Sequence, residues 1–167
     1  IFTSSVAVYP LDLKEPDEET EPQPFNPYGQ SKLEAEQVLR EWARRTPEAS
    51  LTIVRPCVVF GPNNRGNVYN LVNQICQGRF IMVGQGKNKK SMAYVDNLNA
   101  FLVWRLAAPP GIQVFNYADK PDLSVAELVS IVNRAVQRRP MLQDRLRLPY
   151  LAGLVAGCSF DAMARVT

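Results

Sequence analysis

A nearly unbroken apolar and β-branched run over residues 51–60 constrains the fold of this chain more than any other feature. A run of this kind, without polar alternation, is typical of a strand that is buried on both faces of a parallel sheet. A predicted amphipathic helix over residues 27–45 precedes it, and a shorter strand-like segment over residues 1–9 precedes that helix. Strand, helix and strand at this spacing predict a βαβ unit, so the predicted fold class is α/β.

The helix at 27–45 is expected to begin at Pro27, whose ring presets the first turn, and to end at Thr46-Pro47. A proline-rich acidic loop, predicted to be solvated, precedes it. The apolar stripe of the helix is predicted to face the sheet and consists of Leu33, Val38, Leu39 and Trp42. The charged residues are predicted to cover the other side, and they are Glu34, Glu36, Arg40, Glu41 and Arg44.

Tyr28 and Lys32 lie one helical turn apart near the start of this helix, so their side chains project from one face. An ammonium beside a phenol stabilises the phenolate, which lets a tyrosine take a proton from a substrate hydroxyl and later return it. Ser5 ends the first predicted strand, and Arg55-Pro56 lies in the second. The two strand ends and the start of the helix are expected to converge above one edge of the sheet. The serine hydroxyl, the phenol and the ammonium would then face one pocket, where they could move a proton on or off a carbinol oxygen while a hydride leaves its carbon. Taken alone, the Tyr/Lys spacing is a weak signal, because ordinary surface helices often carry such a pair.

Composition excludes several classes of function. The chain has no histidine, which removes histidine bases, Ser-His-Asp triads and histidine-ligated metals, and we expect no metal site. A net charge of +3 is too small to indicate a nucleic-acid or membrane-surface partner. The longest apolar stretch, residues 148–158, is too short to span a bilayer. The three cysteines lack the spacing of a disulfide framework, so we expect reduced thiols and a cytoplasmic protein; they are Cys57, Cys76 and Cys158.

The remainder of the chain alternates further helices and short strands. Helices are predicted over residues 67–77, 96–107 and 124–138, the last of them opened by a capping box of Ser124 and Glu127. Strands are predicted over residues 80–83, 91–95 and 113–117, with a glycine-rich basic turn at 84–90. The tail, residues 142–167, is weakly patterned and is predicted to be helical.

Five segments carry a resemblance to a known family: residues 3–9, 26–32, 55–62, 90–96 and 115–119. In their order and spacing they resemble the extended short-chain dehydrogenases/reductases, in particular the NAD-dependent nucleotide-sugar epimerase/dehydratase branch. The resemblance covers about residues 1–140. It implies the C-terminal part of a Rossmann-like doubly wound parallel sheet plus a small α/β substrate-binding lobe.

The resemblance also implies roles for individual residues, with NAD or NADP as the cofactor. Ser5 would hydrogen-bond the reacting sugar oxygen, Tyr28 would be the general acid/base, and Lys32 would support it and hold the nicotinamide ribose. The backbone that packs on the nicotinamide end would be that of Pro56, Cys57 and Val58. Asn67 and Val68 would begin a helix beside the nucleotide sugar. Lys90 stands where the family often has an arginine on the diphosphate, so it supplies charge without a bidentate fork.

Departures from the family pattern narrow the expected reaction. The family's 4,6-dehydratases carry acidic residues where this chain has Val6 and Ala7. The 3,5-epimerase/reductases need a cysteine at the position of Ala7 and a histidine, and this chain has no histidine. Classical 4-epimerases have an asparagine where Val58 stands. A nucleotide-sugar epimerase acting at C4 through a 4-keto intermediate is the favoured function. The alternatives are a keto-sugar reductase/dehydrogenase that consumes NAD(P)H, and a folded fragment without activity.

The family's glycine-rich pyrophosphate-binding turn is missing from this sequence. Gly84-Gln85-Gly86 does not qualify, because it lies between late short strands and not between a first strand and its helix. The chain is therefore interpreted as a C-terminal fragment. The resemblance also implies a homodimer, because family members often dimerise through helices that include the one with Tyr28. The predicted domains are a second Rossmann half at 1–60 and a substrate lobe at 61–95. The last Rossmann helix and strand are predicted at 96–120, and C-terminal lobe helices at 121–167.

Overall fold

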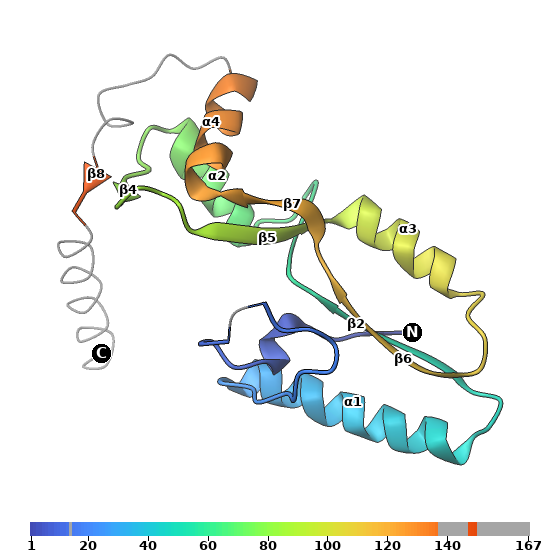
Figure 1. Ribbon diagram of the computed structural model, residues 1–167. Helices are drawn as coiled ribbons and strands as arrows, with labels where there is room; N and C mark the ends of the chain where they lie inside the picture. Colours follow the sequence, from blue (N-terminus) through green and yellow to red (C-terminus); the bar gives the residue numbers. More distant parts are fainter. Residues whose placement is uncertain (14, 137–146, 150–167) are drawn as a thin grey trace. The chain divides into compact units, whose positions relative to one another are not determined.

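The computed structural model describes residues 1–13, 15–136 and 147–149, and the chain divides into two compact units (Figure 1). Unit 1 comprises Ile1–Asn63 and Ser91–Lys120, and unit 2 comprises Asn64–Lys90 and Pro121–Thr167. The functional roles that the sequence suggests for residues 1–60, 61–95, 96–120 and 121–167 stay predictions.

A parallel three-stranded sheet forms the centre of unit 1, in the order β1 (Phe2–Thr3), β2 (Ser50–Pro56) and β6 (Gly111–Tyr117). In its register, Ile53 of β2 lies between Phe2 and Val114. The central strand β2 is buried from its second residue to its last. This arrangement confirms the predicted α/β class with a parallel sheet.

The predicted strand at 51–60 is in fact two strands. β2 ends at Pro56, and after Cys57 the short strand β3 (Val58–Phe60) joins a different sheet, of order β3-β5-β7. Its neighbour β5 spans Lys89–Tyr94, and β7 spans Asp119–Ser124. Pro56 has no N–H group for the ladder, which favours the end of a strand at this point.

Helix α1 has the predicted bounds, Pro27–Arg45. Asn26 caps its first turn by accepting a hydrogen bond from Gly29 N–H at 2.7 Å. Leu39 and Ala43 pack on Leu51 and Ile53 of β2, so the helix lies along the sheet (Figure 1).

The predicted faces of α1 are partly wrong. Val38 and Trp42 are 67% and 49% exposed, whereas Glu36, predicted to face solvent, is 1% exposed. The side chain of Glu36 is buried because it finds an arginine, Arg55, on the adjacent strand.

Residues 1–9, predicted as a short strand that runs into a turn, have this form: β1 stops after Thr3 and a 3₁₀ turn, η1 (Val6–Val8), follows. Ser5 caps this turn, because its Oγ accepts a hydrogen bond from Ala7 N–H at 3.1 Å. A local side-chain bond of this kind competes with the extended conformation.

The last helix of unit 1, α3 (Val95–Arg105), lies within two residues of its predicted bounds. It packs aromatic residues against β6, where Phe101 meets Phe115 and Tyr117 at centroid distances of 5.4 and 5.2 Å. Strand β7 was not predicted, since its Lys-Pro-Asp sequence is unusual in strands.

In unit 2, α2 (Asn67–Cys76) and α4 (Val125–Ala135) pack together (Figure 1). The predicted capping box at Ser124 and Glu127 is confirmed. Strand β4 (Met82–Val83) pairs with β8 (Arg147–Leu148), so the predicted tail helix is wrong at these two residues. Residues 142–146 and 150–167, including Cys158, and the predicted helical residues 137–138 lie outside the described residues.

None of the helices within the described ranges combines the length and apolar character that crossing a membrane requires. Over the same ranges, no three His, Cys, Asp or Glu side chains gather in a way that could hold a metal ion.

Candidate functional site

Tyr28 and Lys32 meet at the start of α1, where β1 ends. The Lys32 ammonium donates a hydrogen bond to the carbonyl oxygen of Thr3, the last residue of β1, at 3.1 Å. Its nitrogen lies 5.8 Å from the centroid of the Tyr28 ring and 5.3 Å from that of Phe2. Tyr28 itself is 55% exposed, so the phenol is accessible to a ligand. The predicted convergence of these two groups at a strand end is present, and their catalytic roles stay predictions.

Ser5 belongs to the turn that packs directly on the same end of α1. A Cβ atom at Gly29 would lie 2.1 Å from the carbonyl oxygen of Ala7, so only glycine allows η1 and the helix to approach this closely. The Ser5 hydroxyl accepts from Ala7 N–H and still has its own hydrogen to donate. The turn of Ser5 and the first turn of α1 are thus fixed against each other by backbone packing.

The three residues predicted to line the nicotinamide end follow one another where β2 ends. Pro56 is buried and pairs with Tyr117 of β6, and Cys57 N–H donates to the Tyr117 carbonyl at 3.0 Å. Val58 is exposed and begins β3. Because β1 and β2 are parallel neighbours, this is the same edge of the sheet at which Lys32 binds Thr3.

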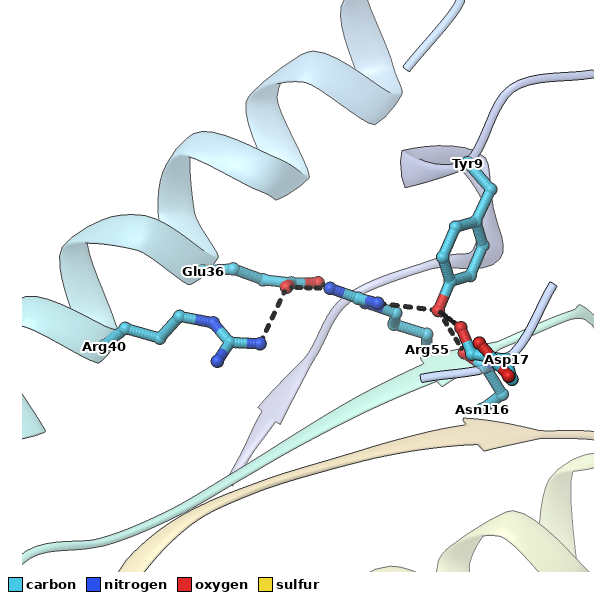
Figure 2. Close-up of polar contacts among 6 residues, drawn as sticks. All are labelled: Tyr9, Asp17, Glu36, Arg40, Arg55 and Asn116. Carbon is cyan, nitrogen blue, oxygen red and sulfur yellow. Dashed lines mark hydrogen bonds and ion pairs between the residues drawn. The ribbon is translucent and has the colours of Figure 1, made fainter. Parts of the chain in front are cut away.

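Sequence reasoning missed a buried polar network beneath this edge (Figure 2). Arg55 of β2 donates to both carboxylate oxygens of Glu36, from Nε at 2.9 Å and from Nη2 at 2.6 Å. Arg55 is 2% exposed, and it also donates from Nη1 to the Tyr9 hydroxyl at 2.6 Å. Burial alone lowers the pKa of Arg55, but the hydrogen bonds that Arg55 donates to Glu36 and Tyr9 outweigh it and hold the pKa above its usual value.

The network continues from Tyr9 into the acidic loop. The phenol has one hydrogen, which it gives either to Asn116 Oδ1 at 2.9 Å or to the Asp17 carbonyl at 2.8 Å. Asn116 in turn donates from its side chain to the Pro16 carbonyl and from its backbone to the Glu18 carboxylate. A signal for this network existed in the sequence, because an arginine inside a buried strand requires a carboxylate partner.

The predicted substrate residues Asn67, Val68 and Lys90 belong to unit 2. Asn67 and Val68 form the first turn of α2, whose N-cap, Gly66, makes no side-chain capping bond. Lys90 is exposed on β5. A helix N-terminus of this kind suits an anion, and the roles of these three residues stay predictions.

Comparison with known proteins identifies the family of this chain. Residues 1–118 match the model of the NAD dependent epimerase/dehydratase family. An N-acetyl-alpha-D-glucosaminyl-diphospho-ditrans,octacis-undecaprenol 4-epimerase of Escherichia coli O157:H7 is 50% identical over 169 residues, which cover 100% of this chain and 50% of the relative.

Solved structures share the fold. MoeE5 in complex with UDP-glucose and NAD has a TM-score of 0.69 at 26% identity, over 88% of this chain and 49% of that one. The UDP-glucuronic acid 4-epimerase of Bacillus cereus with NAD has a TM-score of 0.71 at 21% identity, over 88% and 50%. The chain spans half or less of the length of the curated relatives that it matches.

Proposed function

Because this chain belongs to the NAD-dependent epimerase/dehydratase family, we propose that the protein containing it inverts C4 of a sugar carried on a diphosphate. The observation that carries the proposal is the Tyr28–Lys32 pair, held by Thr3 at the end of β1 with the turn of Ser5 packed on the same helix. The donor set fits NAD or NADP, since an ammonium and an exposed phenol stand at the carboxyl edge of a parallel sheet.

In this proposal Tyr28 takes the proton of the C4 hydroxyl and returns it after the sugar has turned over as a 4-keto intermediate. Ser5 donates a hydrogen bond to the same sugar oxygen. Lys32 stabilises the phenolate and, with Tyr28, Pro56, Cys57 and Val58, would hold the nicotinamide end of the cofactor. The bound nicotinamide would supply the hydride acceptor.

Two carriers of the sugar diphosphate are compatible with this chemistry. The name of the 50% identical relative gives a polyprenol-linked substrate, whereas MoeE5 was solved with UDP-glucose. In both molecules the sugar C1 bears a diphosphate, for which Lys90 and the first turn of α2, with Asn67 and Val68, are the proposed contacts. We propose a nucleotide sugar or a polyprenyl-diphospho-sugar as the substrate.

A single-step reductase of a keto sugar is the second candidate. It is favoured by Val58, an apolar residue at the edge of β3 where classical 4-epimerases have an asparagine. The valine side chain cannot hydrogen-bond a sugar. The pocket therefore lacks one contact that would hold the 4-keto sugar while it turns over.

Product analysis separates the two candidates. We expect the protein as the cell makes it to convert UDP-N-acetylglucosamine or its polyprenyl-diphospho analogue into the C4 epimer without net consumption of cofactor. NMR of the sugar measures the amount of C4 epimer formed, and absorbance at the NADH band measures the amount of cofactor consumed. Stoichiometric oxidation of NAD(P)H with a keto sugar would instead identify the reductase, and turnover of only one carrier would identify the substrate class.

Residues 1–167 alone are expected to show no measurable binding of NAD. The pyrophosphate of a dinucleotide is bound by a glycine-rich turn at a helix N-terminus, and this sequence contains no such turn. Isothermal titration calorimetry measures the dissociation constant of NAD for residues 1–167. The protein as the cell makes it is the positive control. A micromolar dissociation constant for residues 1–167 would contradict the interpretation of the chain as the catalytic part without the cofactor cradle.

The proposal includes a cytoplasmic protein that works as a homodimer. The exposed apolar side chains Val38 and Trp42 on α1 support a helix-mediated dimer, because large exposed apolar residues on one helix favour a protein contact.

A further inference from the structure

Arg55 makes contacts that lead to both halves of the proposed catalytic site. One edge of its guanidinium binds the carboxylate of Glu36 on α1, and the remaining nitrogen binds the hydroxyl of Tyr9, the residue that follows η1 (Figure 2). Helix α1 carries Tyr28 and Lys32, and η1 is capped by Ser5. We propose that Arg55 is a positioning residue that sets where the Ser5 hydroxyl lies relative to the Tyr28–Lys32 pair. This inference rests on the proposed function.

The link to the helix fixes its rotation. Glu36 follows Lys32 by four residues and Tyr28 by eight, so the three side chains lie along one band of α1. The planar fork of an arginine accepts a carboxylate in one orientation, which a lysine cannot reproduce. A rotation of the helix by about 10° would move a group about 6 Å from its axis by about 1 Å. Misplacement of about 1 Å is enough to lower a catalytic rate by about 100-fold.

The link to the turn runs through a buried phenol. Tyr9 is 2% exposed, its hydroxyl accepts from Arg55, and the guanidinium carbon lies 5.0 Å from the centroid of the Tyr9 ring. The same hydroxyl bonds Asn116 or the Asp17 carbonyl, so it also ties the turn to β6 and to the loop that leads into α1. Removing this single oxygen would break the side-chain link between the turn of Ser5 and Arg55 and leave the Glu36–Arg55 pair and the backbone packing of Gly29 on Ala7 intact.

The experiment measures kcat and KM in the protein as the cell makes it, with urea unfolding to establish that each variant is folded. Tyr9→Phe is expected to lower kcat about 10-fold, and Arg55→Lys about 100-fold, with KM within about twofold of the wild type. The ligand contacts are unchanged in both variants, so the loss falls on kcat.

The matched control is Arg105→Lys. Arg105 is also buried, at 8% exposure, but it bonds Thr52 and Gln113, in the first halves of β2 and β6, and lies over the rings of Phe115 and Trp104. We expect this variant to lose stability and to keep kcat within about twofold. If Arg105→Lys lowers kcat as much as Arg55→Lys does, the effect is general loosening and the inference is wrong.

Two results separate this inference from the proposed function. If Tyr28→Phe abolishes turnover while folded Tyr9→Phe keeps the wild-type kcat, the function stands and the positioning role is wrong. If the wild type produces no epimer from either sugar carrier, the proposed function fails on its own. Tyr9→Phe removes one oxygen only, so the inference can be tested even if Arg55→Lys does not fold.

Discussion

Replacing Tyr28 by phenylalanine is expected to lower kcat for epimerisation by about 1,000-fold, within the range that loss of a general acid/base produces. The variant keeps the ring that lies 5.8 Å from the Lys32 nitrogen and loses only the hydroxyl that we propose exchanges a proton with the sugar. The chain has no histidine that could take over this proton transfer. We therefore expect the dissociation constant of the sugar diphosphate to change by less than about threefold.

Ser31→Ala is the matched control for this prediction. It removes a hydroxyl from the same turn of α1, but that hydroxyl donates to the Tyr28 carbonyl at 2.8 Å and serves the helix backbone. Its kcat should stay within about twofold of the wild type. Single-turnover measurement of cofactor reduction in the two variants isolates the hydride step. Wild-type turnover in Tyr28→Phe would rule out the phenol as the acid/base.

Local signals made much of the fold predictable. The bounds of α1 follow from Asn26 as a cap, Pro27 in the first turn and Thr46-Pro47 at the end, and all of these act within a few residues. The nearness of Tyr28 and Lys32 follows from helical periodicity in the same way. Strand β2 follows from its continuous apolar run, because only a strand covered on both faces tolerates one.

The rest depended on contacts between residues far apart in the chain. Tyr9 and Asn116 are separated by 107 positions, and no local pattern indicates that their side chains meet. The amphipathic pattern placed Glu36 on the solvent side, because a charged residue in a helix is usually exposed. Its burial is decided by Arg55 on β2, so the two residues had to be interpreted together.

The role of Gly29 is of the same kind. In the sequence it is one residue of the first helical turn, where a glycine costs stability relative to alanine. In the structure its missing side chain makes room for the Ala7 carbonyl, and thereby for the turn that carries Ser5. A residue that is unfavourable for the helix is thus required by the packing of the candidate site.

Glu36→Ala is expected to destabilise the protein by about 3–5 kcal/mol, the usual cost of removing one partner of a buried ion pair. The substitution leaves the Arg55 guanidinium, 2% exposed, without its carboxylate. An arginine cannot escape this cost by losing its proton. Urea unfolding, followed by circular dichroism at constant pH and salt, measures the change in the free energy of unfolding.

Glu41→Ala provides the same substitution on the solvent side of the same helix. Glu41 pairs with Arg45 one turn away, and both side chains are largely exposed, so its loss should cost less than about 0.5 kcal/mol. Replacing Glu36 and Arg55 together by methionine should recover most of the stability that Glu36→Ala loses, because the fully buried guanidinium is removed with its carboxylate and Arg40, the other partner of Glu36, is 28% exposed to water. Equal destabilisation by Glu36→Ala and Glu41→Ala would contradict the assignment of a buried, paired carboxylate. We expect the double methionine variant to recover stability but not kcat. This outcome would show that the Glu36–Arg55 pair matters more for positioning the catalytic residues than for the stability of the fold.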